Sequence, residues 1–133
     1  MRIDKFNIET INTKQVYIHD DILDRLQFDK IGKKLHLEFS QSCLHGRKYT
    51  IDFINVIGFE ITSCDFWGMS HHVLDFEYVE CSNQRVLPKI RNKWAEVSQY
   101  NFVPSYQNYI ETLITFSSGD QLFIACEYIF LEK

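Results

Sequence analysis

Two segments in the first half of the chain alternate apolar and polar residues one by one. The segments span residues 34–40 and 48–53, and their apolar side chains are Leu35, Leu37 and Phe39, then Tyr49, Ile51 and Phe53. A period of two places the apolar side chains of a β-strand on one face and the polar ones on the other. Both segments therefore predict strands with one buried face.

Two further segments favour strands. Leu74, Phe76 and Tyr78 alternate with Asp75 and Glu77, which predicts an amphipathic strand with the three apolar side chains inward. Residues 20–28 fit either a strand or a short helix capped by Asp20. We prefer the strand, because residues 29–33 then form the turn into the next strand.

The end of the chain predicts a hairpin. Residues 110–116 and 121–131 are strand-like and flank a turn at residues 117–120, where Gly119 can adopt a positive φ. The second segment is apolar on both faces, so we expect a central strand that is covered on both sides.

The segment 56–61 is expected to extend the strand that begins at Lys48. Asn55 interrupts the apolar phase, and Gly58 marks either a bulge or the close approach of another backbone.

One helix is expected, over residues 88–97. Pro88 suits the first helical position, and Ile90, Trp94 and Val97 recur at helical spacing. Lysine and arginine residues in its first half oppose the helix dipole, and packing of Trp94 on the sheet would offset that cost.

Together these segments predict a mainly β fold, either a β-sandwich or a strongly bent antiparallel sheet, with one short helix near residues 88–97. An α+β fold is the alternative. With 133 residues, the chain has the length of a single domain over residues 1–133. Its aromatic content of 15% also favours strands.

The charge of the chain argues against nucleic-acid binding. The formal net charge is −4, whereas nucleic-acid-binding proteins usually carry a basic surface. Positive charge is concentrated in one place, at Arg85, Lys89, Arg91 and Lys93. We interpret it as the solvated face of the short helix.

The sequence also predicts a cytoplasmic protein that does not bind a membrane. No run approaches the roughly 20 apolar residues of a membrane span. Residues 1–10 include four charged side chains and therefore lack the apolar core of a signal peptide. Cys43, Cys64, Cys81 and Cys126 are irregularly spaced, so we expect reduced cysteines in the core rather than a disulfide framework.

No metal, cofactor or catalytic site is expected. Cys64, His71, His72 and Cys81 lack the paired spacing of zinc ligands. Cys126 lies among apolar residues and predicts an inert thiol. Asp75 and Glu77 could work as a carboxylate pair, but we interpret them as the solvent side of a strand. The sequence also lacks a recognisable enzyme motif, which leaves only a motif-free enzyme open.

Two loop-like segments are candidate binding surfaces. Residues 65–72 carry Trp67, His71 and His72, and residues 98–109 carry Tyr100, Phe102, Tyr106 and Tyr109 without any charge. Tryptophan often anchors interfaces, and uncharged loops rich in tyrosine suit adaptable recognition. The alternatives are that Trp67 plugs one end of the sandwich and that the second segment is a loop packed down by its own aromatic side chains.

Our leading interpretation is a non-enzymatic protein-interaction module that binds a protein partner. Small, acidic, β-rich bacterial proteins of this kind resemble immunity or antitoxin-type proteins, which mask a partner. One alternative is a small-ligand-binding or motif-free enzymatic domain with a pocket near Trp67 and His71. Another is a structural subunit that pairs with copies of itself through its apolar C-terminal strand.

Overall fold

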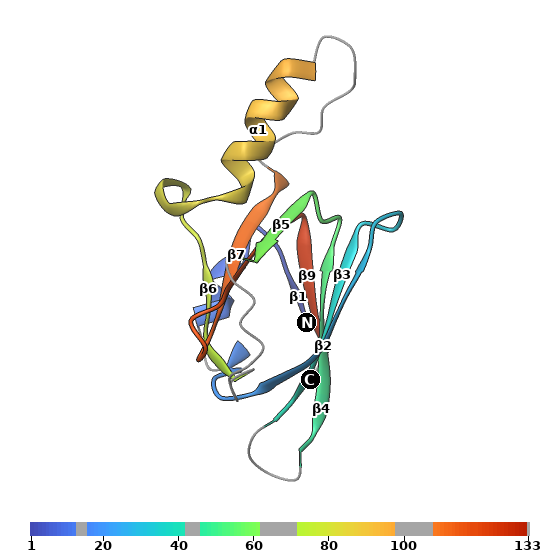
Figure 1. Cartoon of the computed structure of the whole chain (residues 1–133), viewed down its shortest axis with the longest axis vertical. Coiled ribbons are helices and arrows are strands. Elements are labelled where there is room, and N and C mark those ends of the chain that lie inside the picture. The colour runs from blue at the N-terminus through green and yellow to red at the C-terminus, as the bar shows by residue number, and fades with distance from the viewer. Residues whose placement is uncertain (13–15, 42–45, 62–71, 98–107, 133) are drawn as a thin grey trace.

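Two antiparallel β-sheets face each other in the computed structural model, and a helix packs against part of the outer face of one of them (Figure 1). The structure describes residues 1–12, 16–41, 46–61, 72–97 and 108–132. The first sheet has the order β1 (Arg2–Ile3), β9 (Tyr128–Glu132), β4 (Lys48–Ile54), β3 (Lys34–Ser40) and β2 (Ile22–Asp29). The second has the order β5 (Gly58–Ile61), β8 (Gln121–Cys126), β7 (Ile110–Phe116) and β6 (Val73–Tyr78). The mainly β prediction is confirmed.

The alternating segments form the strands expected of them. Leu35, Leu37 and Phe39 of β3 and Ile51 and Phe53 of β4 are fully buried in the core between the sheets. β3 pairs with both β2 and β4, so the prediction that residues 20–28 form a strand is also confirmed. The apolar faces predicted for these two strands from their alternation therefore lie in the core.

The prediction for β6 was wrong at Leu74. The pairing of β6 with β7 is irregular between Val73 and Asp75, as at a β-bulge. A bulge adds one residue and shifts the alternation of faces. Val73 and Phe76 are therefore buried, whereas Leu74 is 52% exposed.

The predicted second strand of the C-terminal hairpin is in fact two strands. β8 belongs to the second sheet and β9 to the first, with Glu127 between them. Even-numbered residues face the main core in β8, as with Ile124, but odd-numbered ones do so in β9, as with Ile129. β8 is covered on both faces, as expected, since Ile124 lies in the main core and Phe123 in a second apolar cluster. β9 is covered on one face only, because Phe130 is 42% exposed. Each half is a central strand of its own sheet, as expected.

The chain makes a second crossing beside the first. β4 ends at Ile54 in the first sheet and β5 begins at Gly58 in the second, so β5 is not an extension of β4. Asn55, between them, has a φ of 54°. Backbone bonds join the crossings, since Glu127 N donates to Ile54 O at 3.1 Å and Ile57 N to Ala125 O at 3.0 Å. We call this double crossing the corner.

The two sheets also approach each other on the side away from the corner. Asp20 N donates to Val73 O at 2.7 Å, and Val73 N donates to Asp21 O at 2.8 Å. A β-bridge between Ile22 and His72 lies next to them. The N-terminal 3-10 helix η1 (Ile8–Asn12) packs against β6 and adds apolar side chains to the core.

Helix α1 (Val86–Val97) covers part of the second sheet, lying over β5 and β8. It begins two residues earlier than predicted, so Pro88 is its third residue rather than its first. A second apolar cluster forms beneath it, to which Leu87, Leu113 and Phe123 belong. Within the described part of the chain, no helix combines the length and hydropathy needed to cross a membrane.

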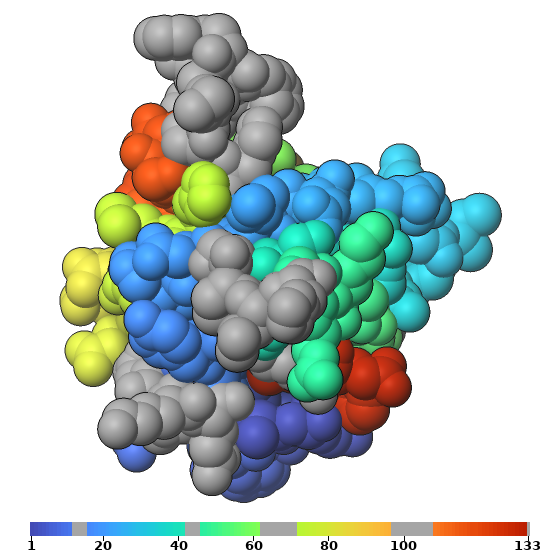
Figure 2. Space-filling view, turned by 90° about the horizontal axis from the view of Figure 1, so that it is seen from below, coloured from blue at the N-terminus to red at the C-terminus, as the bar shows by residue number. Residues whose placement is uncertain are grey.

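Both predicted turns are present. Gly119 has a φ of 91° between β7 and β8. The turn between β2 and β3 is organised by Asp29, whose side chain accepts hydrogen bonds from the backbone N–H groups of Ile31 and Gly32. The β2–β3 hairpin projects from the body of the protein, as its blue-to-cyan atoms show in Figure 2.

Candidate functional site

Most of the residues predicted to bind a partner lie outside the described residues: Trp67, His71, Tyr100, Phe102 and Tyr106. His72 is described and lies immediately before β6. Its Nδ1 atom lies 2.9 Å from the backbone oxygen of Asp20. Its ring is therefore engaged in joining the two sheets.

The cysteines differ in their environments. Cys126 is fully buried, and burial followed by the charge of Glu127 raises the pKa of its thiol. This agrees with the inert thiol that the sequence predicts. Cys81 is exposed in the 3-10 helix η3 (Cys81–Asn83), so its expected place in the core was wrong. Cys43 and Cys64 lie outside the described residues.

Asp75 and Glu77 lie on the outward side of β6. Burial, and secondly the charge of Asp75, raises the pKa of Glu77. Glu77 and Glu80 border a hollow of about 460 Å³ over Leu113 and Phe123. Within the described ranges, no three histidine, cysteine or acidic side chains gather as metal ligands would.

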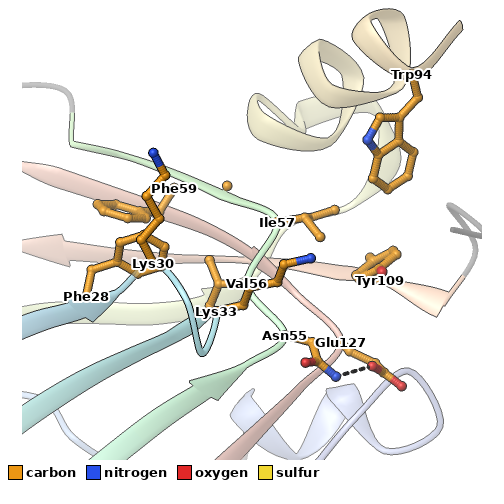
Figure 3. Close-up of a pocket in the computed structure, with 11 residues that line it drawn as sticks. Phe28, Lys30, Lys33, Asn55, Val56, Ile57, Phe59, Trp94, Tyr109 and Glu127 are labelled. Carbon is orange, nitrogen blue, oxygen red and sulfur yellow. Dashed lines mark hydrogen bonds between the residues drawn. The ribbon is translucent and has the colours of Figure 1, made fainter. Parts of the chain in front are cut away.

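A larger hollow lies where the β2–β3 hairpin, the corner and helix α1 meet (Figure 3). Its volume is about 890 Å³, within the range of roughly 300–1,000 Å³ that is usual for ligand pockets. We call it the corner groove. Its lining residues are Phe28, Lys30, Lys33, Asn55, Val56, Ile57, Gly58, Phe59, Trp94, Tyr109 and Glu127.

Aromatic pairs stand on two sides of the corner groove (Figure 3). Phe28 of β2 packs edge-on against Phe59 of β5, with ring centroids 4.9 Å apart. On the other side, Trp94 of α1 packs edge-on against Tyr109, with centroids 5.9 Å apart. Ile57 lies between the two pairs. Edge-to-face packing is the preferred geometry of such rings, so they hold each other in place.

The base of the corner groove is fixed by polar contacts at the corner. Asn55 Nδ2 donates to Glu127 Oε2 at 2.6 Å. Val56 N donates to Lys33 O at 2.8 Å, which ties the β2–β3 turn to the corner. The groove wall formed by the turn is therefore anchored to the groove floor.

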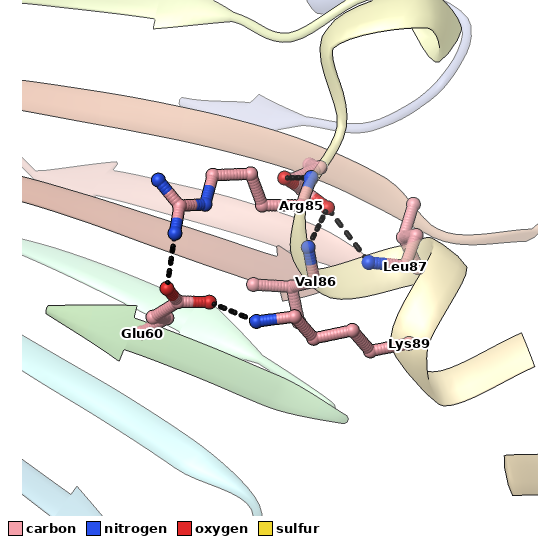
Figure 4. Close-up of polar contacts among 6 residues, drawn as sticks. Glu60, Arg85, Val86, Leu87 and Lys89 are labelled. Atoms are coloured by element: carbon pink, nitrogen blue, oxygen red, sulfur yellow. Dashed lines mark hydrogen bonds and ion pairs between the residues drawn. The ribbon is translucent and has the colours of Figure 1, made fainter. Parts of the chain in front are cut away.

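Glu60 holds helix α1 in place beside the groove. One of its carboxylate oxygens accepts a hydrogen bond from Arg85 at 2.8 Å, and the other accepts one from Lys89 at 2.9 Å (Figure 4). The hydrogen bond from Lys89, together with the charges of both cations, lowers the pKa of Glu60. Two of the four residues in the basic run thus share one carboxylate within the fold.

Glu111 holds the start of the same helix. Its carboxylate is fully buried and accepts hydrogen bonds from the backbone N–H groups of Arg85, Val86 and Leu87 at 2.7–2.9 Å (Figure 4). These are groups that a helix leaves without intrahelical partners, and a negative charge there also suits the helix dipole. The carboxylate offsets the unfavourable cations that the sequence places in this helix.

Gly58 sets how closely α1 approaches the sheet. A Cβ atom on Gly58 would lie 2.7 Å from Ile90 Cδ1 and 2.9 Å from Val86 Cγ1. The groups that approach Gly58 closely are helix side chains, and not the other backbone that the sequence analysis offered as one alternative.

Positive side chains outnumber negative ones among the described residues that line the corner groove. Lys30 and Lys33 form no ion pair with any carboxylate in the described part of the chain. The carboxylate of Glu127 already accepts the hydrogen bond from Asn55. Burial, and secondly the charge of Glu127, raises the pKa of Tyr109, so its phenol keeps its proton near neutral pH. The groove thus offers aromatic surface, cations and a neutral hydroxyl.

Lys30, Lys33, Tyr109 and Glu127 are the charged and hydroxyl-bearing side chains among the described residues that line the groove. The side chains that can contact a bound molecule are mainly aromatic and aliphatic, with lysines at one side. Such surfaces occur at the centres of protein interfaces.

Sequence reasoning had identified only part of this site. Trp94 was expected to pack on the sheet, and Tyr109 was grouped with the aromatic loop. Phe28 and Phe59 were missed, because they lie on separate strands that only the corner brings together. The best signal in the sequence was Asn55, whose interruption of the apolar phase marks the corner.

Comparisons with known proteins give no functional assignment. No protein-family model matches the sequence, and no curated protein matches it. A crystal structure of an uncharacterized protein from Neisseria gonorrhoeae is similar to it with a TM-score of 0.49 and 21% sequence identity. That similarity covers 88% of this chain and 94% of the other.

Proposed function

We propose that the chain is a non-enzymatic protein-interaction module and that the corner groove is its partner-binding surface. One observation carries this proposal. Aromatic and aliphatic side chains from β2, β5, α1 and the start of the β7 segment converge on a single hollow of about 890 Å³. Large aromatic side chains in partly enclosed sites supply much of the binding energy of protein interfaces.

The way the groove is built supports this proposal. Contacts at the corner anchor its floor, while Glu60 and Glu111 fix helix α1. A site held in one conformation loses less conformational entropy when its partner binds. The groove therefore has a large contact surface that is already ordered.

The proposed setting is the cytoplasm of a bacterial cell, where a module of the immunity or antitoxin type masks a partner. Masking needs an extensive binding surface and no chemistry, which matches the composition of the groove. Tyr100, Phe102 and Tyr106 remain part of this proposal as residues of the segment 98–109. Trp67 and His71 remain part of this proposal as residues of the segment 65–72.

Affinity purification with matched variants tests the proposal. The tagged protein, Trp94→Ala and Leu74→Ala are purified from the source cells, and co-purifying proteins are quantified by mass spectrometry. Leu74 is also an exposed apolar residue, but it lies at the opposite end of the second sheet. We expect one partner in stoichiometric amount with the unchanged protein and Leu74→Ala, and a loss of at least fivefold with Trp94→Ala, as for an interface anchor.

Thermal unfolding of the variants shows whether each remains folded. If a folded Trp94→Ala retained the partner in full, the corner groove would not be its binding surface. If light scattering found stable oligomers of the chain alone and no foreign partner bound, the structural-subunit interpretation would replace this one.

A further inference from the structure

We infer that the occupant of the corner groove is an acidic segment of a partner protein that carries at least one aromatic or large aliphatic anchor. The inference rests on the proposed function and adds the chemistry of the partner. It runs against the net charge of −4, which by itself would favour a basic partner.

Charge complementarity at the hairpin side of the groove is the first support. Lys30 and Lys33 line the groove and have no ion-pair partner in the described ranges, whereas neighbouring Lys34 pairs with Asp52 at 3.6 Å. Glu127, the carboxylate among the described lining residues, accepts a hydrogen bond from the neutral amide of Asn55 and keeps its charge, so two lysines and one glutamate leave the described lining net positive. The groove therefore presents two available cations, and an acidic segment would neutralise them.

Hydrogen bonds hold the backbone of the turn that carries these lysines. Asp29 Oδ1 accepts two backbone hydrogen bonds within the turn, and Lys33 O accepts one from Val56 N. The backbone of Lys33 has a φ of 53°. Two cations on a fixed turn favour one position of a carboxylate-bearing chain, which is how electrostatic complementarity sets the register of a complex.

The apolar part of the groove is the reason to expect an aromatic or large aliphatic residue in the partner segment. Ile57, Phe59 and Trp94 lie beyond the lysines and leave apolar surface open to solvent. Ile31, at the tip of the turn between the two lysines, is 96% exposed. An occupant with charge alone would leave this surface uncovered, so we expect acidic and apolar residues together.

These features favour a protein segment over a nucleic acid. A nucleic-acid surface needs cations along the path of several phosphates. Here two lysines face the groove, while Arg85 and Lys89 nearby are engaged by Glu60.

Selection from a random peptide library displayed on phage tests the inference without assuming a partner sequence. The full chain is the bait, and Trp94→Ala serves as the subtraction control. We expect the enriched peptides to carry net negative charge and an aromatic or large aliphatic residue. Enriched peptides that are basic or neutral would overturn the inference, and so would the absence of any enrichment.

Fluorescence anisotropy with one labelled, selected peptide then locates the charge contact. We expect the double variant Lys30→Glu and Lys33→Glu to weaken binding by at least tenfold. The matched control Arg47→Glu and Lys48→Glu reverses two exposed cations away from the groove and should change binding less than twofold. A single-stranded oligonucleotide should not compete, and competition at similar concentration would contradict a protein segment as the occupant.

Different results would contradict the proposed binding surface and the proposed acidic chemistry of the partner. If the partner found by affinity purification depends on Trp94 but the lysine reversals leave its binding unchanged, the acidic chemistry is wrong and the interaction module stands. If Trp94→Ala retains that partner, the groove itself is the wrong surface.

Discussion

Asn55 donates a hydrogen bond to Glu127 where the chain crosses twice between the two sheets, with 2.6 Å between Nδ2 and Oε2. The two residues are 72 positions apart in sequence. Each stands between two strands that belong to different sheets. This bond therefore joins the two crossings and forms the base of the corner groove.

Substitutions of Asn55 separate the contribution of its hydrogen bond to Glu127 from that of its left-handed backbone conformation. Asn55→Gly keeps a residue that tolerates the φ of 54° but removes the amide, and should cost about 0.5–1.5 kcal/mol of folding stability. Asn55→Ala should cost about 1 kcal/mol more, because alanine is strained in the left-handed region. Urea unfolding measures both. An alanine variant as stable as the glycine variant would show that the backbone there relaxes freely.

A side chain at Gly58 should push helix α1 away from the sheet. Gly58→Ala places a Cβ atom within 3 Å of Val86 and Ile90, so we expect a loss of about 1–3 kcal/mol. Val86→Ala should recover part of that loss when the two changes are combined, because it removes the less adaptable neighbour. Strictly additive losses in denaturant unfolding would contradict this contact.

Glu111 should matter more than any exposed carboxylate. Glu111→Gln replaces an oxygen with an NH₂ group, which cannot accept hydrogen bonds from the helix N–H groups. We expect a loss of about 3 kcal/mol and faster amide hydrogen exchange in the first turn of α1. Glu132→Gln, at the exposed end of β9, should change stability by less than about 0.5 kcal/mol. Equal losses for the two variants would remove the capping role.

Glu60 and Glu77 should affect the pH dependence of stability in opposite directions. The pKa of Glu60 is lowered from 4.5, so its contribution is present above that pH and is lost as the pH falls through the folded-state value. Glu60→Gln should therefore destabilise at about pH 7 and be neutral well below the folded-state pKa.

The pKa of Glu77 is raised from 4.5, so the folded state holds that proton more tightly and ionisation destabilises it. Glu77→Gln should stabilise the fold at about pH 7 and have no effect at about pH 3. Thermal unfolding across this pH range checks both variants, and shifts of the same sign at neutral pH would contradict the assignment.

The sequence predicted those parts of the fold that local alternation determines. β3 and β4 follow a strict period of two, and their apolar faces are the buried ones. The crossing at Glu127 could not be predicted in this way, because a strand that is apolar on both faces and a strand that changes sheets have the same composition. The exposure of Leu74 depends on a bulge that the alternation does not reveal.

The site was less predictable because its parts are distant in sequence. The lysines of the β2–β3 turn, Phe59 and Trp94 meet only after the corner and α1 have formed. Glu111 gave a signal that was overlooked, since it is a charged residue within an apolar strand. A buried carboxylate needs hydrogen-bond donors, and the helix start supplies them.

Site-specific photo-crosslinking in the source cells tests the central claim most directly. A photoreactive amino acid replaces Ile31, at the exposed tip beside the corner groove, or Leu74, at the far end of the second sheet. The account predicts one dominant crosslinked protein from position 31, its loss when Trp94→Ala is added, and little crosslinking from position 74. Equal crosslinking from both positions, or a product at position 31 that persists with Trp94→Ala, would contradict it.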